Sequence, residues 1–169
     1  NDREDLYPFH HYEHICLTQE ENIALKNEIL KIISESKKVL KICSFIITAK
    51  EIFNAILTKA KETQIAIFIL TQLDPAKLEN SLSLFDFITE EEIKENPSRS
   101  HLKFIKQLYD NGIHVRASLS AHAKFIVSDR TIGFITSANF TTPSLTFNTE
   151  SGTYLDETSS RELDRLFDV

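Results

Sequence analysis

Hydrophobic residues near the start of the chain change from helical spacing to a continuous run. Over residues 19–37 they recur three or four positions apart, and Thr18 and Glu21 have the spacing of a capping box, so this segment predicts an amphipathic helix. Residues 39–47 form a nearly continuous apolar run, which is typical of a strand covered on both faces. We therefore expect a first helix packed against a central strand.

The two segments that follow complete a βαβ unit. Thr48 and Glu51 form a second capping box, which opens a helix to about residue 62, and residues 64–71 form another apolar run. Two strands joined by a helix in this way lie parallel and are connected by a right-handed crossover. The strands of residues 39–47 and 64–71 are therefore expected to be parallel neighbours.

An irregular connection separates this unit from the second half of the chain. Residues 74–98 contain Pro75, Pro97 and an acidic run, which predict an insertion with one or two short helices. The insertion is either a lid over a site or a solvated surface segment. A helix over residues 98–111 follows and ends at Gly112, a residue type that favours the C′ position.

The rest of the chain predicts short strands and one last helix. Apolar, β-prone runs place strands at residues 113–117, 123–127, 132–136 and 151–155, and a helix begins at about residue 160. Together with the βαβ unit, these elements predict an α/β fold. Its sheet should be mixed, mainly parallel, and flanked by helices on both faces.

Length and composition limit the domain organisation. The 169 residues, of which 41% are hydrophobic, suffice for one globular domain, which we place at residues 18–169 after a polar lead-in over 1–17. No apolar run reaches the roughly 20 residues that span a bilayer, so we expect a soluble protein. The chain opens on Asn1 and contains no methionine, so we also expect a processed or excised piece of a larger protein with further domains.

The cysteine and histidine residues in the first half of the chain do not predict a disulfide framework or a metal site. Cys16 and Cys43 are too few for a disulfide framework, and Cys43 lies in an apolar strand, so a reducing, cytoplasmic compartment is expected. His10 and His14 could bind a metal on a helix, but Pro8 and the missing third ligand favour a loosely ordered lead-in. We therefore expect neither a metal nor another cofactor.

Residues 122–139 carry the densest group of chemically active side chains. His122 and Lys124 are two positions apart on a strand and point to one face, and Ser137 and Asn139 have the same spacing after the next strand. Taken singly, each residue is more typical of a solvated strand edge or a turn. A hairpin would bring the two pairs side by side, and such donors together suit a phosphoryl group.

The same residues resemble a known signature. The order His122-x-Lys124, four residues, Asp129, six residues and Thr136-Ser137-x-Asn139 resembles the HKD motif of the phospholipase D superfamily, which reads H-x-K, four residues, D, six residues, G-S-x-N. Thr136 replaces the usual glycine and should crowd the turn slightly. The motif occurs once, so the chain resembles the small single-motif nucleases of that superfamily.

This resemblance implies a phosphodiesterase, most directly a nuclease. His122 would attack phosphorus and form a covalent phosphohistidine, while Lys124, Ser137 and Asn139 hold the non-bridging oxygens. Downstream, Asn148-x-Glu150 is similar to the N-x-E segment of the family, whose acid orients the histidine. The resemblance therefore gives Glu150 that orienting role.

A single motif leaves the proton donor unassigned. A second histidine must protonate the leaving oxygen, so we expect it to come from another copy in a two-fold homodimer that meets at the motif face. Lys124 and a protonated histidine supply positive charge without a metal. Asp129 lies in the turn, and its spacing fits a structural role as well as a catalytic one.

The charge distribution bears on the substrate. The net charge of −6 argues against a broad nucleic-acid-binding surface. The segment from Arg99 to Arg130, however, has six basic residues and two acids. One interpretation is a basic strip that borders the motif, with Arg116 and Arg130 as substrate-binding residues. The other is that Lys103 and Lys106 belong to a solvated helix face with no binding role. A nucleic acid is the expected partner.

Two other functions fit the sequence. A phospholipid phosphodiesterase of the same superfamily would need an apolar surface near the site, which the insertion could supply through its leucine and phenylalanine residues (Leu82, Leu84, Phe85 and Phe87). A nucleic-acid-binding or regulatory domain could keep the fold without turnover, although the presence of both His122 and Lys124 argues against it.

Overall fold

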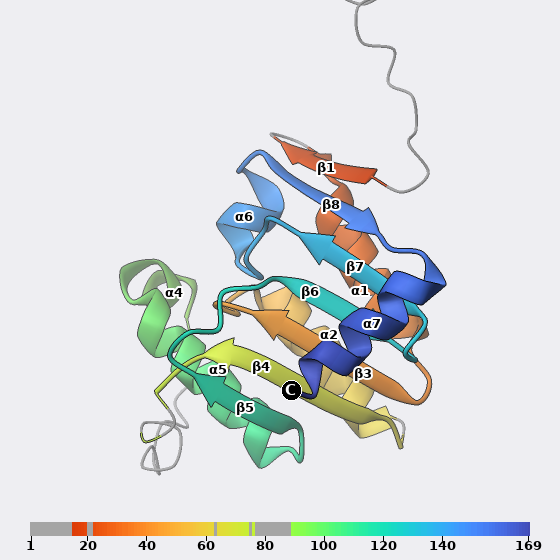
Figure 1. Cartoon of the computed structure of the whole chain (residues 1–169). Helices are drawn as coiled ribbons and strands as arrows, with labels where there is room; N and C mark the ends of the chain where they lie inside the picture. Colours follow the sequence, from red (N-terminus) through yellow and green to blue (C-terminus); the bar gives the residue numbers. More distant parts are fainter. Residues whose placement is uncertain (1–14, 20–21, 63, 75, 77–88) are drawn as a thin grey trace, which may run out of the picture.

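The computed structural model describes residues 15–19, 22–62, 64–74, 76 and 89–169 (Figure 1). Within these residues the strands form one eight-stranded sheet in the spatial order β2-β1-β8-β7-β6-β3-β4-β5. The strands are β1 (Ile15–Gln19), β2 (Asn22–Ile23), β3 (Val39–Ser44), β4 (Ala66–Gln72), β5 (His114–Ser118), β6 (Phe125–Ser128), β7 (Ile132–Thr136) and β8 (Glu150–Tyr154). The helices are α1 (Ala24–Glu35), α2 (Lys50–Glu62), α4 (Glu90–Glu95), α5 (Pro97–Asp110), α6 (Thr142–Thr146) and α7 (Glu157–Phe167).

The sheet is mixed, as predicted, but its parallel part is smaller than predicted. β3 pairs with β4 in parallel, which confirms the parallel neighbours expected from the βαβ pattern, and β4 pairs with β5 in parallel. The other strand pairings in the described part of the chain are antiparallel. The pair β6 and β7 is joined by a short connection, which favours antiparallel pairing.

Helices cover both faces of the sheet, which confirms the predicted α/β class. In Figure 1, α7 lies in front of the sheet while α1, α2 and α5 lie behind it. β3 serves both layers, because Leu40 and Ile42 belong to the large core on the side of α1, α2 and α5, whereas Cys43 belongs to a smaller cluster with Phe125 and Phe167. The front layer is therefore thin, with α7 as its helix.

The first helix begins later than predicted. Residues 15–19 form β1, which pairs antiparallel with β8, and α1 starts at Ala24 without a side-chain cap. The backbone of Thr18 pairs with that of Glu150, so Thr18 does not cap a helix. Pairing with a distant strand overrode the local capping signal here.

The central strand is shorter than its apolar run. β3 ends at Ser44, and Ile47 forms only an isolated bridge with Phe140. α2 then begins at Lys50, and the Glu51 carboxylate forms an ion pair with Lys26 at 3.1 Å. A mostly apolar loop over residues 45–49 therefore separates β3 from α2, at the end of the strands where the motif lies.

Other boundaries agree closely with the predicted elements. α5 begins at Pro97, and Gly112 follows it with a φ of +84°, as the C′ position requires. α7 begins at Glu157, three residues earlier than predicted, because the Asp156 carboxylate accepts a hydrogen bond from the N–H of Ser159 at 2.7 Å.

Several predictions concern residues outside the described ranges. These are the His10 and His14 pair and the apolar residues of the insertion (Leu82, Leu84, Phe85 and Phe87). The described part of the insertion ends in α4 and the start of α5. None of the described helices combines the length and apolar character that a bilayer span requires.

Candidate active site

The predicted hairpin exists and gathers most of the motif. β6 and β7 pair antiparallel, and their turn contains Asp129 and Arg130 with φ values of +50° and +65°. Paired positive φ values give the turn a twist that matches the strands of a hairpin. At the other end, the N–H of Thr136 donates to the carbonyl of Lys124 at 3.1 Å. The start of β6 and the end of β7 are thereby tied together.

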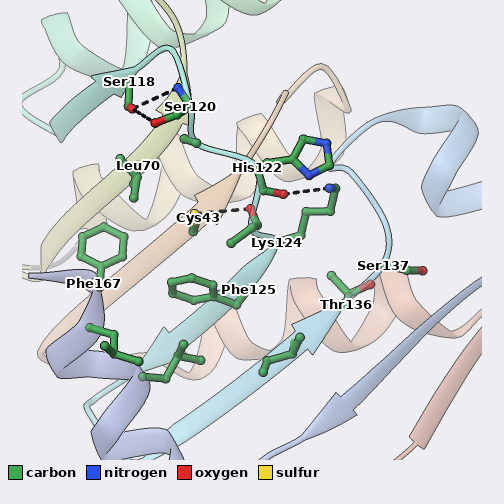
Figure 2. Close-up of a pocket in the computed structure, with 15 residues that line it drawn as sticks. Cys43, Leu70, Ser118, Ser120, His122, Lys124, Phe125, Thr136, Ser137 and Phe167 are labelled. Carbon is green, nitrogen blue, oxygen red and sulfur yellow. Dashed lines mark hydrogen bonds between the residues drawn. The ribbon is translucent and has the colours of Figure 1, made fainter. Parts of the chain in front are cut away.

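A pocket of about 810 Å³ opens at this end of the hairpin (Figure 2). His122, Lys124 and Ser137 line its polar part, so three of the four predicted motif side chains meet there. Ser118 and Ser120 add hydroxyl groups from the end of β5. Sequence reasoning missed these two residues, because only the sheet order places β5 near the motif.

The opposite part of the pocket is apolar. It is lined by side chains of the sheet (Leu70, Phe125 and Ile135) and of α7 (Leu163, Leu166 and Phe167). In Figure 2, Phe125 and Phe167 lie on the side away from the His122 ring. α7 therefore contributes a wall of the pocket, which the chain order gave no reason to expect.

The imidazole of His122 is exposed and free of hydrogen bonds to the described residues. Its ring contacts that of Phe45 edge-on, with centroids 5.2 Å apart and an interplanar angle of 66°. Lys124 lies beside it, and Nζ of Lys124 donates to the carbonyl of His122 at 2.9 Å. Both ring nitrogens of His122 are thus available to a ligand, with a cation close by.

Glu150 contacts the motif through Ser137. The Ser137 hydroxyl donates a short hydrogen bond to Oε2 of Glu150 and accepts one from the N–H of Ser151 at 3.1 Å. The predicted role of Glu150 in orienting His122 stays a prediction, because the carboxylate is bonded to Ser137 in this structure. Two residues of β8, Glu150 and Ser151, therefore hold the Ser137 side chain in place.

Asn139 is the motif residue that the structure does not place in the pocket lining. Its Oδ1 atom is buried and has no hydrogen-bond partner among the described residues. An unsatisfied buried amide oxygen is costly, so a different side-chain orientation in a ligand complex would relieve that cost. The role of Asn139 in holding phosphate stays a prediction.

Thr136, the departure from the family signature, fits without crowding the turn. Its hydroxyl donates to the carbonyl of Ser151 at 2.9 Å and accepts from the N–H of Ala138 at 3.0 Å. A glycine could make neither bond. The threonine side chain therefore joins the end of β7 to β8 and fixes the backbone that leads to Ser137.

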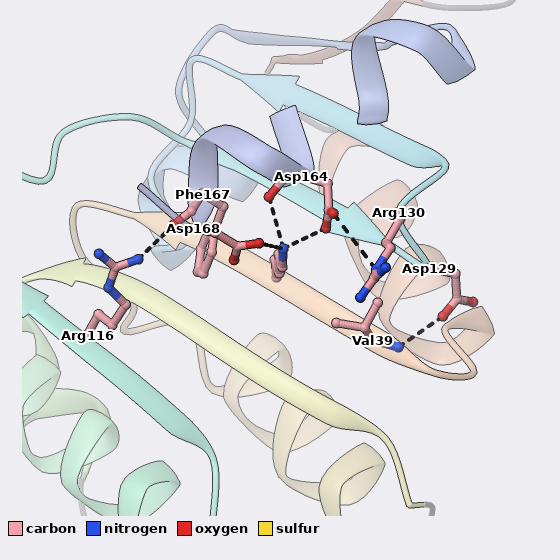
Figure 3. Close-up of polar contacts among 8 residues, drawn as sticks. Val39, Arg116, Asp129, Arg130, Asp164, Phe167 and Asp168 are labelled. Carbon is pink, nitrogen blue, oxygen red and sulfur yellow. Dashed lines mark hydrogen bonds and ion pairs between the residues drawn. The ribbon is translucent and has the colours of Figure 1, made fainter. Parts of the chain in front are cut away.

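Asp129 lies at the turn, at the far end of the hairpin from His122 (Figure 3). Its carboxylate accepts hydrogen bonds from the N–H groups of Lys37, Lys38 and Val39 at 3.0, 2.7 and 3.1 Å. Burial acts to raise the pKa of Asp129, but these three bonds and the charge of Lys38 hold the pKa below its ordinary value. The contacts favour the structural one of its two predicted roles.

Replacing Asp129 by asparagine is expected to lower the free energy of unfolding at pH 7 by about 1 to 2 kcal/mol, because asparagine tolerates the positive φ but lacks the charge and one acceptor. Since the folded pKa of Asp129 is depressed, this stability is present above the ordinary value of 3.8 and is lost as the pH falls through the folded pKa. Urea unfolding of both proteins at pH 7 and at about pH 2 checks this. A difference that stays constant with pH would show that the charge of Asp129 does not stabilise the fold, and a large loss of turnover would argue for a catalytic carboxylate.

The predicted basic strip is largely paired within the protein. Nζ of Lys103 is buried and lies 2.6 Å from a Glu92 carboxylate oxygen, and Lys106 pairs with Asp110. Both predicted alternatives, a basic strip and a solvated helix face, are wrong for Lys103, because its side chain is buried. The spacing of residues in the sequence could not show that burial. A continuous cationic surface is therefore not available along α5.

The two predicted substrate-binding arginines lie outside the pocket lining (Figure 3). Nη1 of Arg116 donates to the carbonyl of Phe167 at 2.8 Å, and Nε of Arg130 lies 3.9 Å from a carboxylate oxygen of Asp164. Both residues therefore face α7. Among the residues that line the pocket, Lys124 is the permanent cation.

Cys43 also lines the pocket, beneath the motif. Its thiol donates to the carbonyl of Ala123 at 3.3 Å. Burial raises the pKa of Cys43 to about 11, although the charge of Lys124 acts to lower it. The thiol is therefore neutral near pH 7 and a weak nucleophile compared with an exposed imidazole.

Solved structures with this fold were found at low sequence identity. The phospholipase D family member Nuc from Salmonella typhimurium matches 91% of this chain and 91% of its own, with 16% identity and a TM-score of 0.70. NucT from Helicobacter pylori matches 91% of this chain and 92% of its own, with 15% identity and a TM-score of 0.60. Phosphatidylserine synthase from Haemophilus influenzae matches 90% of this chain with 36% of its own length, at 16% identity and a TM-score of 0.60.

A sequence family gives the more specific match. The profile described as "Cardiolipin synthase, PLD-like domain" matches residues 29–169, which include the whole motif and the strands that carry it. A search of curated protein sequences finds no match. Since the profile covers most of the sequence and the pocket collects His122, Lys124 and Ser137, the chain belongs to the phospholipase D-like family.

Proposed function

We propose that this protein is a phosphodiesterase that cleaves nucleic acid, with His122 as its nucleophile. The observation that carries the proposal is the meeting of an unbonded imidazole, the Lys124 ammonium and the Ser137 hydroxyl in one pocket. A phosphoryl group bound there would have its non-bridging oxygens near cationic and hydroxyl donors, which stabilise the charge that develops on them.

The reaction we propose has two displacements at phosphorus. A ring nitrogen of His122 attacks phosphorus, the bond to the leaving oxygen breaks, and that oxygen takes a proton from an acid on the opposite side. Water then attacks the phosphohistidine, loses a proton to the same group, and breaks the nitrogen–phosphorus bond. The first step produces an alcohol end, and the second releases a phosphomonoester.

The acid on the opposite side is proposed to be His122 of a second copy. The other described histidines do not line the pocket: His101 is buried with 4% exposure, and the ring of His114 is stacked on Phe68. A two-fold axis beside the motif would place the second imidazole across the phosphate. The thin front layer supports this arrangement, because Leu166 and Ile135 are 68% and 40% exposed beside the pocket.

A lipid substrate is the second candidate, and the apolar part of the pocket favours it. Phe125, Leu163 and Phe167 would suit the start of an acyl chain next to a bound phosphate. One similar structure is named a phosphatidylserine synthase, whereas the two similar in length to this chain are Nuc and NucT. Nucleic acid stays the first candidate because the single motif in a short chain resembles the small single-motif nucleases of the superfamily.

The purified protein is expected to cleave labelled single-stranded DNA, duplex DNA or RNA at an undiminished rate in EDTA, because Lys124 and histidine supply the positive charge in the proposed reaction. No group of three metal-ligating side chains occurs in the described ranges. The measurement compares these substrates with phospholipid vesicles, in EDTA and with added magnesium or zinc.

Each alternative has its own result in that experiment. Activity that EDTA abolishes and a metal restores contradicts the proposed chemistry. Cleavage of the vesicles alone favours the lipid candidate, and binding of nucleic acid without product favours a non-catalytic domain. A phosphohistidine trapped on the peptide that contains His122 would support the nucleophile directly.

A further inference from the structure

We propose that Phe45 is a positioning residue, which holds the imidazole of His122 by an edge-to-face contact and is itself held by a buried polar network that includes Thr71 and His101. The inference rests on the proposed role of His122 as nucleophile. It concerns a loop between β3 and α2 that lies outside the motif.

The ring of Phe45 packs against the imidazole of His122, the proposed nucleophile. Its centroid lies 5.2 Å from that of His122, with the two planes at 66°. Aromatic rings favour such edge-to-face arrangements at centroid separations of about 4.5 to 7 Å. The described residues give the His122 ring no hydrogen bond, so the Phe45 ring is the aromatic contact by which its orientation can be restrained.

Phe45 is placed for this contact rather than for filling the core. It is half-buried and belongs to neither of the two buried hydrophobic clusters. Its neighbours in the chain point elsewhere, because Ser44 is fully buried and Ile47 belongs to the large core. The loop therefore turns one aromatic side chain out of the core and toward the site.

Thr71 on β4 fixes the backbone on either side of this ring. Its hydroxyl lies 2.7 Å from the carbonyl oxygen of Ser44 and 3.3 Å from that of Phe45, so one proton is shared between two acceptors. The Ser44 hydroxyl donates in turn to the carbonyl of Ile46 at 2.9 Å. The peptide groups around Phe45 are thus bonded within the protein.

His101 on α5 completes the network. Nδ1 accepts from the N–H of Ile47 at 3.0 Å, and Nε2 lies 3.1 Å from the Thr71 hydroxyl. Nδ1 also lies 3.2 Å from the carbonyl oxygen of Ile47, so the tautomer decides which ring nitrogen carries the proton. In either tautomer the Thr71 hydroxyl lies beside Nε2 and within hydrogen-bond distance of the Ser44 carbonyl. Burial lowers the pKa of His101, although hydrogen bonds with the backbone of Ile47 and Gln72 act to raise it. The lowered pKa agrees with a neutral ring.

The same loop is also bonded to the end of the motif. The N–H groups of Thr48 and Ala49 donate to the carbonyl of Phe140 at 2.9 and 3.0 Å, directly after Asn139. The loop is therefore held by α5 and β4 on one side and by the motif backbone on the other. Because hydrogen bonds fix the backbone of this loop, the Phe45 ring that it carries can restrain the His122 imidazole.

The test replaces Phe45 by leucine, which keeps an apolar side chain but removes the ring. Turnover number is expected to fall about tenfold with KM within about twofold, because the nucleophile is less well oriented while the phosphate donors are intact. Phe45→Tyr restores the ring and should restore the turnover number. Phe68→Leu is the matched control, since Phe68 stacks on His114 with centroids 4.8 Å apart.

NMR shifts of the imidazole protons give a readout that does not depend on activity. Phe45→Leu should move the His122 resonances and leave those of His114 in place, and Phe68→Leu should do the reverse. Thr71→Val, which removes the shared hydroxyl, should shift His122 in the direction of Phe45→Leu. Since Phe45→Leu also removes a ring current, the Thr71→Val shift, obtained with the Phe45 ring still present, is the more informative of the two. It can be measured even if the wild-type protein cleaves no tested substrate, an outcome that would overturn the proposed function instead.

Three results would overturn the positioning role. Unchanged His122 resonances in Phe45→Leu would mean that the contact does not hold the ring. A full resonance change with an unaltered turnover number in an active enzyme would mean that holding the ring does not serve the reaction. A turnover number that falls equally in Phe45→Leu and Phe68→Leu would indicate a general loss of structure.

Discussion

Replacing His122 by alanine is expected to remove turnover by a factor of about 10⁴ or more while the protein stays folded, because a nucleophile has no substitute in the reaction. The side chain is exposed in the loop three residues before β6, so its loss should change the free energy of unfolding by no more than about 0.5 kcal/mol. Rates of substrate cleavage and thermal unfolding followed by circular dichroism measure the two effects. His114→Ala is the matched control, since His114 is also exposed on the sheet and should keep full activity.

The same variant tests whether two copies share one site. If both copies supply His122, equal amounts of wild-type and His122→Ala chains that exchange subunits should retain about a quarter of the wild-type activity, whereas independent sites would retain about half. Light scattering gives the mass at the assay concentration. Full activity of a monomer would rule out the shared site, and unfolding of His122→Ala would instead indicate a packing role for the imidazole.

Replacing Asp164 by alanine is expected to lower the free energy of unfolding by about 3 kcal/mol, because it leaves a buried cation with poorer compensation. Lys41 belongs to β3, is 4% exposed and contacts α7 through Asp164, which Figure 3 labels. Its Nζ atom lies 2.8 Å from Oδ1 of Asp164 and 2.9 Å from the carbonyl of the same residue. Oδ1 has no partner with hydrogen-bond geometry in the described structure, so charge rather than a directed bond holds this contact.

Asp168 provides the matched control for that variant. It also lies 2.8 Å from Nζ of Lys41, but its side chain is 63% exposed whereas that of Asp164 is 9% exposed. Water screens an exposed ion pair, so Asp168→Ala should lower the free energy of unfolding by less than about 1 kcal/mol. Urea unfolding of the two variants gives the comparison, and equal losses would contradict the importance of burial. Lys41→Met combined with Asp164→Leu should recover most of the stability.

The pocket depends on the same contacts. Leu163 and Phe167, on either side of Asp164 in α7, line its apolar part, and the Phe167 ring lies 5.6 Å from Nζ of Lys41. Loosening α7 should therefore widen the pocket on its apolar side while leaving the hairpin with His122 in place. A greater loss of substrate affinity than of turnover number is the corresponding effect on activity.

The hairpin could be predicted from the sequence because its determinants are local. The hairpin and its turn at Asp129 were enough to bring His122 and Lys124 to the same end as Ser137. The predicted strand alternation does not apply to this pair, because β6 begins at Phe125 and both residues lie in the loop before it. The hydrogen-bond partner of Glu150 could not be predicted in this way, because the bond to Ser137 depends on how β8 lies beside β7. The packing of residues far apart in sequence decided that detail.

Long-range pairing also explains the elements that were misplaced or passed over. Residues 15–19 became a strand because β8 offered an edge, although their own pattern and capping residues suggested the approach to a helix. Lys41 was hidden within an apolar run, and its role appeared only when α7 placed Asp164 above it. The positions of Arg116 and Lys103 likewise depended on partners that spacing cannot reveal.

The pairing of β1 with β8 has a consequence for how the protein opens. β1 joins residues 15–19 to a strand more than a hundred positions later, so the loop that it closes is long and its formation carries a large entropy cost. β1 and β2 also form the outer border of the sheet, whereas β3 and β6 lie in its interior. Local unfolding should therefore begin at β1 and β2 and spread inward, and amide hydrogens there should exchange sooner than those of β3. Because the hairpin of β6 and β7 is joined directly to β3, the proposed catalytic groups can remain assembled in molecules whose outer border has already opened.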